Sequence, residues 1–191
     1  MDSEVQSLTS TGIPSGKIGV WWFLASEIAV FGGLIASYVV VRLGSAGWSE
    51  AAAHINFRLG LVNTFILLTS SLTMVVAFRG VQDKDSKKLR TNLGLTILLG
   101  LSFLAIKAFE YAGEIGEGFT PAAGIFWSFY FGMTGLHALH VLAGIIANLI
   151  LWVAASRNRL KPNEHRIELA GLYWHFVDIV WVFLFPLLYL T

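Results

Sequence analysis

Five long apolar segments dominate this sequence and restrict how the chain can fold. A helix needs roughly 20 apolar residues to cross the hydrocarbon core of a bilayer, and each segment reaches that length. The segments lie near residues 17–42, 59–78, 93–112, 122–155 and 169–190. Because backbone groups inside lipid must satisfy one another, we expect an all-α integral membrane bundle of five transmembrane helices.

Composition supports a membrane protein and excludes several other classes. Hydrophobic residues make up 55% of the chain and charged residues only 13%, whereas soluble domains carry about 25% charged residues. A net charge of +1 provides no field for a polyanion, so we expect no nucleic-acid partner. The chain has no cysteine, which rules out disulfides and thiolate metal centres.

Basic residues are divided unevenly between the two sides of the predicted bundle. One side carries Lys17, Arg79, Lys84, Lys87, Lys88, Arg90, Arg157, Arg159, Lys161 and Arg166. The other side carries Arg42 and Arg58. The positive-inside rule therefore predicts a cytoplasmic N-terminal tail over residues 1–16, a single transmembrane domain over residues 17–191, and a C-terminus outside.

The first apolar segment carries a stripe of small residues. Ala25, Ala29, Gly33 and Ser37 recur at every fourth position. Such stripes allow another helix to approach closely, where lipid provides no hydrophobic drive for association. The sequence predicts a packing face, and both another helix of this chain and a partner subunit remain open as its occupant.

Glu27 lies on nearly the opposite side of this segment from the small residues. At about 1.5 Å per residue it stands about 15 Å from Lys17, near the middle of a bilayer. Three interpretations remain open for this carboxyl group: a protonated acid bonded to a neighbour, a part of a proton or ion path, and a contact to a lipid or a partner subunit.

Four further ionisable residues lie in the last two apolar segments. His137 and His140 are three apart, as are His175 and Asp178, so each pair is expected on one helical face. His175 and Asp178 could share a hydrogen bond there. The histidines could also bind a metal with the acids. A metal needs ligands at a common depth, however, and we expect a hydrogen-bonded network of Glu27, His137, His140, His175 and Asp178, with no metal.

Lys107 and Glu110 are three apart near the outer end of the third segment. Side chains at this spacing meet on a helix surface. We therefore expect a local ion pair at the membrane interface, which needs no further function.

Five motifs in the right order resemble one membrane family over nearly the whole chain from Gly16 onward. They are Phe23-Leu24-Ala25-Ser26-Glu27-Ile28, Leu61-Val62-Asn63-Thr64 with Leu68-Thr69-Ser70-Ser71, Lys107-Ala108-Phe109-Glu110-Tyr111, Gly135-Leu136-His137-Ala138-Leu139-His140-Val141, and Trp174-His175-Phe176-Val177-Asp178-Ile179-Val180-Trp181. Each falls in a predicted helix. Together they resemble subunit III of the heme-copper terminal oxidases.

This resemblance implies a non-catalytic subunit with no redox centre of its own. Such a subunit sits in the bacterial inner membrane and packs against oxidase subunits I and II, with the hemes and copper in its partners. It is thought to hold lipid, ease oxygen delivery and sustain proton uptake. Glu27 matches the family's membrane glutamate. Longer members begin with two extra helices that form a wall of the lipid cleft, so a phospholipid bound here needs that wall from another subunit.

Two alternatives to an oxidase subunit remain. One is an accessory relative attached to another respiratory complex, such as one associated with nitric oxide reduction. The other is a small transporter or proton channel that uses Glu27 and Asp178, although the sequence lacks the internal repeat or broken helices typical of transporters. Nothing resembles a nucleophile with its base or an open metal site, so we expect no catalysis by this chain alone. The electron donor, cytochrome c or quinol, is not determined by these residues.

Overall fold

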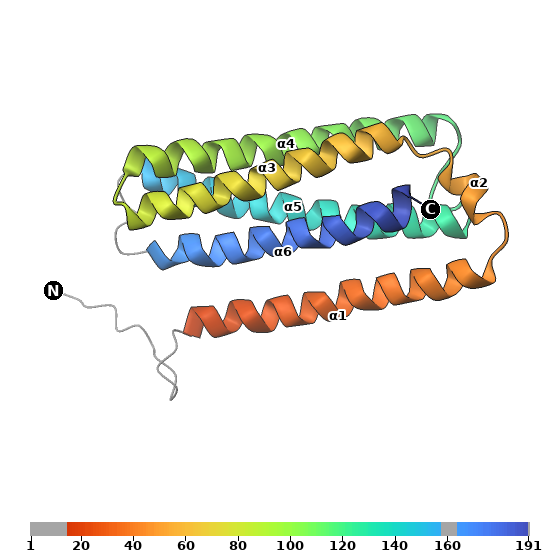
Figure 1. Cartoon of the computed structure of the whole chain (residues 1–191), viewed down its shortest axis with the longest axis horizontal. Coiled ribbons are helices and arrows are strands. Elements are labelled where there is room, and N and C mark those ends of the chain that lie inside the picture. Colours follow the sequence, from red (N-terminus) through yellow and green to blue (C-terminus); the bar gives the residue numbers. More distant parts are fainter. Residues whose placement is uncertain (1–14, 158–163, 191) are drawn as a thin grey trace.

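The computed structural model describes residues 15–157 and 164–190, and this part of the chain is helical (Figure 1). Its helices are α1 (Ser15–Gly44), α2 (Trp48–Ala52), α3 (Phe57–Gln82), α4 (Ser86–Gly116), α5 (Ile125–Ser156) and α6 (Glu164–Tyr189). Residues 1–14 of the predicted tail, and the basic residues Arg159 and Lys161, lie outside the described residues.

Five of these helices are long and apolar enough to cross a membrane, which confirms the predicted number of spans. Helices α3, α4, α5 and α6 form a four-membered bundle in which each helix packs against two others. Helix α1 runs along one side of this bundle, against α5 and α6 (Figure 1). The short helix α2 was not predicted, because its five residues are too few to give a periodic pattern.

Two side chains in the connecting segments cap the N-termini of the helices that follow them. The Asn56 side chain accepts hydrogen bonds from the backbone N–H groups of Arg58 and Leu59 at the start of α3. Asp85 does the same for Lys87 and Lys88 at the start of α4. Such caps satisfy backbone donors that have no partner inside the helix. The two caps therefore define the residues at which α3 and α4 begin.

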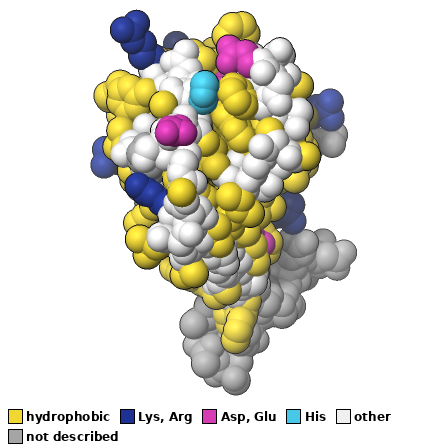
Figure 2. Space-filling model, turned by 90° about the vertical axis from the view of Figure 1, so that its right-hand side faces the viewer, with side chains coloured by type: hydrophobic (Ala, Val, Ile, Leu, Met, Phe, Trp, Pro, Cys, Tyr) yellow, Lys and Arg dark blue, Asp and Glu magenta, His cyan; other side chains and the backbone are white. Residues whose placement is uncertain are grey.

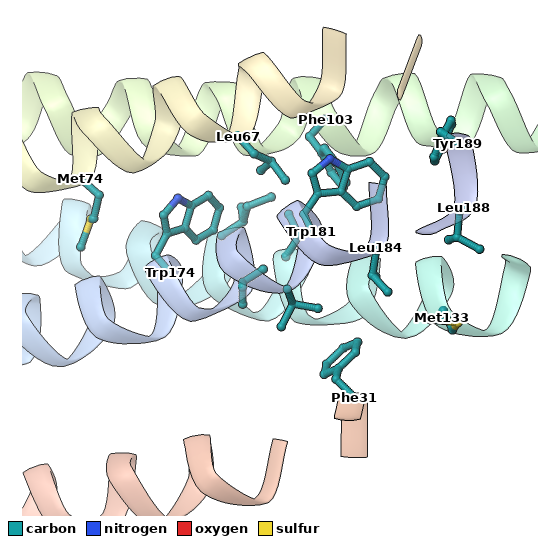
Figure 3. Close-up of a cluster of buried hydrophobic side chains, with 14 of the residues drawn as sticks. Phe31, Leu67, Met74, Phe103, Met133, Trp174, Trp181, Leu184, Leu188 and Tyr189 are labelled. Carbon is teal, nitrogen blue, oxygen red and sulfur yellow. The ribbon is translucent and has the colours of Figure 1, made fainter. Parts of the chain in front are cut away.

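Two tryptophans of α6 occupy the middle of the bundle (Figure 3). Trp174 and Trp181 are both fully buried. The Trp174 indole N–H donates to the Ser70 hydroxyl at 3.0 Å, and the Trp181 N–H donates to the Thr64 hydroxyl at 3.0 Å. Buried indoles require such a partner. The hydroxyls of α3 therefore fix the depth and rotation of α6.

Helix α1 is tied to the bundle by polar contacts at three heights. Near its start, the Lys17 ammonium lies 2.6 Å from the Glu168 carboxylate of α6. Halfway along, the Glu27 carboxyl contacts His140 of α5 at 3.0 Å. Near its end, the Tyr38 hydroxyl donates to a backbone carbonyl at the end of α6. These contacts span most of the length of α1.

The small-residue stripe of α1 faces away from the rest of the chain. Ala25, Ala29, Gly33 and Ser37 are all exposed. A Cβ atom added at Gly33 would meet no atom within 4 Å. The interpretation of this stripe as a contact between helices of one chain is therefore wrong for the described residues, because α1 turns the opposite side toward α5 and α6. Contact with a partner subunit stays a prediction.

The Tyr38→Phe variant is expected to loosen the outer end of α1. The buried Tyr38 hydroxyl donates to the Leu187 carbonyl and accepts the Trp48 indole N–H at 3.1 Å. Removing it takes the acceptor from the buried Trp48 N–H and a donor from the Leu187 carbonyl, which costs about 1–3 kcal/mol. Equilibrium unfolding of the purified chain in mixed micelles measures this loss. The neighbouring control Ser37→Ala should change little, because the exposed Ser37 hydroxyl donates only to the Gly33 carbonyl of its own helix. Equal losses of unfolding free energy in Tyr38→Phe and Ser37→Ala would show that the Tyr38 hydroxyl does not hold α1 against α6.

Candidate functional site

Glu27 and His140 form a polar pair between α1 and α5. A Glu27 carboxyl oxygen lies 3.0 Å from the His140 Nε2 atom. The His140 Nδ1 atom lies 2.8 Å from the Leu136 backbone carbonyl, which can only accept a hydrogen bond, so Nδ1 carries a proton. The Glu27–His140 contact then needs one shared proton, either on the carboxyl oxygen or on Nε2. The pair can hold that proton without a net charge.

Aromatic side chains surround this pair on the α1 side of the bundle. The Phe31 ring meets the His140 ring edge to face, with centroids 5.3 Å apart. The Tyr173 hydroxyl of α6 donates to the His140 carbonyl at 3.0 Å, and its ring contacts Phe23. The side chains of Glu27 and His140 remain 16% and 14% exposed. The pair is therefore half-buried and reaches the flank of the bundle.

His137 does not join the pair, although it lies one turn away on α5. Its ring is fully buried and packs against Phe103 of α4 and Trp181 of α6, with centroid distances of 5.6 and 5.2 Å. Neither ring nitrogen has a hydrogen-bond partner within the described chain. The prediction of one shared face is wrong, because side chains three positions apart differ by about 60° in direction, so His140 is directed at α1 while His137 is directed at α4 and α6.

His175 and Asp178 are also separate. The His175 Nδ1 atom contacts the Ser71 hydroxyl of α3 at 2.7 Å. Asp178 is buried, and its two carboxyl oxygens have no hydrogen-bond partner in the part of the chain that the structure describes. The expected hydrogen bond between the two residues is therefore wrong. Of the five predicted residues of the network, only Glu27 and His140 contact each other, and His137, His175 and Asp178 make no direct hydrogen bond to another of the five in the described part of the chain.

The described residues contain no group of three or more histidine, aspartate or glutamate side chains that could hold a metal ion. The reason is geometric. His140 points toward α1, His137 toward α4 and α6, and His175 toward α3, as their contacts indicate. A site with three protein ligands, as a catalytic zinc requires, is not assembled from these positions.

Lys107 and Glu110 form the predicted ion pair, with the Lys107 Nζ atom 3.0 Å from Glu110 Oε2. The two side chains are only 3% and 1% exposed, so the protein encloses the pair, and its position at the membrane interface stays a prediction. The Lys107 ammonium also donates to the hydroxyls of Tyr130 and Tyr189, at 3.1 and 2.8 Å. The pair therefore joins α4, α5 and α6 inside the bundle.

The two tyrosines that bind Lys107 were not identified from the sequence. Tyr130 and Tyr189 lie on different helices, and the spacing within each helix does not indicate that their hydroxyls meet Lys107. A weak signal exists, since a tyrosine in an apolar helix needs a partner for its hydroxyl when buried. The contact of Lys107 with both tyrosines is made through their hydroxyl groups, and Nζ stands 4.7 and 5.5 Å from the ring centroids of Tyr130 and Tyr189.

Comparisons with known proteins identify one family over nearly the whole chain. A family model described as "Cytochrome c oxidase subunit III" matches residues 3–191. The chain is 36% identical over 177 residues to "Cytochrome c oxidase subunit 3" of Corynebacterium diphtheriae, covering 91% of this chain and 86% of that protein. It is 34% identical over 176 residues to "Probable quinol oxidase subunit 3" of Staphylococcus aureus, covering 91% and 88%. The chain belongs to the cytochrome c oxidase subunit III family.

Proposed function

We propose that this chain is the non-catalytic subunit III of a proton-pumping heme-copper terminal oxidase. In this role it stabilises the catalytic subunit and supports proton uptake, lipid binding and oxygen access during aerobic respiration. The observation that carries the proposal is the Glu27–His140 pair, which joins two helices. Placing a glutamate inside a membrane costs free energy, and such residues usually have a function. Family membership limits that function to an oxidase complex.

The pair supports two consequences of its geometry. Helix α1 is fixed halfway along its length, since Glu27 bonds to α5 where few other polar side chains of α1 reach the bundle. The shared proton also gives the site a reserve of one proton at the flank of the bundle. Release of that proton would leave a carboxylate facing an unprotonated Nε2 atom, so the site retains the proton until another replaces it.

The proposed partners are oxidase subunits I and II, together with membrane lipids. The stripe of Ala25, Ala29, Gly33 and Ser37 is exposed and offers a close approach for one helix of a partner subunit. The hemes and copper belong to those partners in this proposal. The excess of basic residues at the α3–α4 turn supports an N-terminus in the cytoplasm and a location in the bacterial inner membrane.

Purification through a tag on this chain in mild detergent tests the proposal. We expect heme, copper and a large multi-helix subunit to accompany the chain, detected by visible spectrum and mass spectrometry. The accompanying proteins would also identify the electron donor as cytochrome c or quinol. A colourless chain that runs alone or as a homo-oligomer would contradict the proposal and favour a transporter.

Substitution of Glu27 separates the role of its shape from that of its charge. In Glu27→Gln the amide N–H can still donate to His140 Nε2, so the catalytic subunit should co-purify within about twofold of the unaltered amount. In Glu27→Ala the bond is lost, which costs about 1–1.5 kcal/mol and lowers recovery by roughly fivefold to tenfold.

The control for this pair of variants is Thr69→Ala on α3, because the exposed Thr69 hydroxyl donates only to the Phe65 carbonyl of its own helix. Recovery in this control should equal that of the unaltered chain. Equal losses in Glu27→Gln and Glu27→Ala would show instead that the negative charge itself holds a partner.

A further inference from the structure

A second polar cluster lies away from the Glu27–His140 pair, at the end of the bundle that carries the C-terminus. Its cation is Lys107, whose ammonium has three N–H donors. These donate to Glu110 Oε2 and to the hydroxyls of Tyr130 and Tyr189. The Tyr189 hydroxyl in turn donates to Glu110 Oε1 at 2.8 Å. Lys107 and Glu110 are therefore fully bonded to their neighbours and to each other.

Glu114 lies one turn further along α4 and has no such partner. Its side chain is buried, with the residue 7% exposed, and its Oε2 atom has no hydrogen-bond partner in the described part of the chain. Lys107 has no donor left to offer it. Because an unbonded buried oxygen is tolerated far better on a neutral acid than on an anion, the geometry favours an uncharged Glu114.

The charges around Glu114 lead to the same conclusion. The titratable and charged side chains in this region are Lys107, Glu110, Tyr111 and Glu117 on α4, Tyr130 on α5, Tyr189 on α6, and the exposed Glu50, His54 and Arg58 before and at the start of α3. None of the ion pairs formed within residues 15–157 and 164–190 includes Glu114. The buried part of the cluster thus holds one cation and two carboxyl groups.

We propose that Glu114 is a proton-binding site, a neutral carboxylic acid held beside the Lys107–Glu110 ion pair and in exchange with the water at this end of the bundle. Uptake adds one proton from water to the carboxylate and forms an O–H bond, which leaves the three groups with no net charge. Release returns one negative charge to the cluster. Figure 2 looks onto this end, where acidic and histidine side chains reach the surface of the chain.

Infrared spectroscopy of the full-length chain in lipid nanodiscs tests this site, because a protonated carboxyl group gives a C=O stretch that a carboxylate lacks. At neutral pH we expect the difference between the spectra of the unaltered chain and Glu114→Gln to contain such a band, since any contribution from Glu27 and Asp178 cancels in this difference. The band should persist in the control Glu117→Gln, since Glu117 is exposed to water. Identical spectra for the unaltered chain and Glu114→Gln would show an ionised Glu114 and overturn the proposal.

A second variant tests the charge balance and does not depend on removing Glu114. In Glu110→Gln the shape is kept, but Lys107 loses its anion and should recruit Glu114 as a carboxylate. The Glu114 C=O band is then expected to fall to less than one fifth of its area at neutral pH. Retention of the full band in this variant, with folding verified by circular dichroism, would overturn the proposed balance between Lys107 and the two acids.

Discussion

Gly144→Ala is expected to destabilise the bundle by about 1–3 kcal/mol, which is the usual cost of forcing extra atoms into a packed core. A Cβ atom at position 144 would stand 2.7 Å from Trp174 Cε3 and 2.8 Å from its Cζ3. The indole has little room to move, because Gly100 of α4 also approaches it, and a Cβ there would be only 2.8 Å from Cη2. Trp174 is thus clamped between α4 and α5. Alanine is the better helix former, so intrinsic propensity predicts the opposite sign.

The matched control is Gly132→Ala on the same helix, where an added Cβ would meet nothing within 4 Å. This variant should be neutral or slightly stabilising. Equilibrium unfolding of both variants in mixed micelles gives the comparison. If the clash with the indole is the cause, Gly144→Ala should cost less in a Trp174→Phe background, a coupling that a double-mutant cycle measures. Equal changes in the unfolding free energy of Gly144→Ala and Gly132→Ala would show that Trp174 is not tightly packed against Gly144.

Lys107→Met is expected to be the most damaging single change, with a loss of about 3–5 kcal/mol, since it leaves Glu110 as an uncompensated charge inside the bundle. The methionine keeps the length of the side chain, so little packing is lost. Three hydrogen bonds disappear with the ammonium, those to Glu110, Tyr130 and Tyr189. The double variant Lys107→Met with Glu110→Gln should recover part of this loss, because the buried charge is then gone.

The control for Lys107 is Lys88→Met at the α3–α4 turn. The Lys88 ammonium lies 2.8 Å from the Asp83 carboxylate, but the two side chains are 34% and 57% exposed. Exposed pairs contribute at most about 1 kcal/mol. Unfolding free energies should therefore differ several-fold between Lys107→Met and Lys88→Met. Similar values for the two would indicate that Lys107 is not enclosed in the folded chain.

The spans and the polar residues inside them could be predicted from the sequence, because the hydrophobic length of a helix and the cost of an ionisable group in lipid depend on local composition. Glu27, His140 and Lys107 were identified on this ground. The start of α3 was placed near residue 59 instead of Phe57, because Arg58 interrupts the apolar run there and only the Asn56 cap bonds mark the first turn. The short helix α2 carried no signal of its own.

The partners of those polar residues could not be predicted. Spacing within one helix placed His137 with His140 and His175 with Asp178, yet His140 bonds to Glu27 and His175 to Ser71. A spacing of three leaves about 60° between two side chains, which is enough to direct them at different neighbours. Which neighbour lies in each direction depends on the arrangement of all five long helices.

The sequence by itself determined a five-span helical membrane protein and the identity of its ionisable residues, since both follow from the order of apolar and polar side chains. Only the tertiary structure decided that Glu27 pairs with His140, that Lys107 is enclosed by tyrosines, and that the small-residue stripe of α1 faces outward. The physical reason is that these outcomes depend on the rotation of each helix about its own axis. Side-chain packing between helices, such as Trp174 between Gly100 and Gly144, sets that rotation.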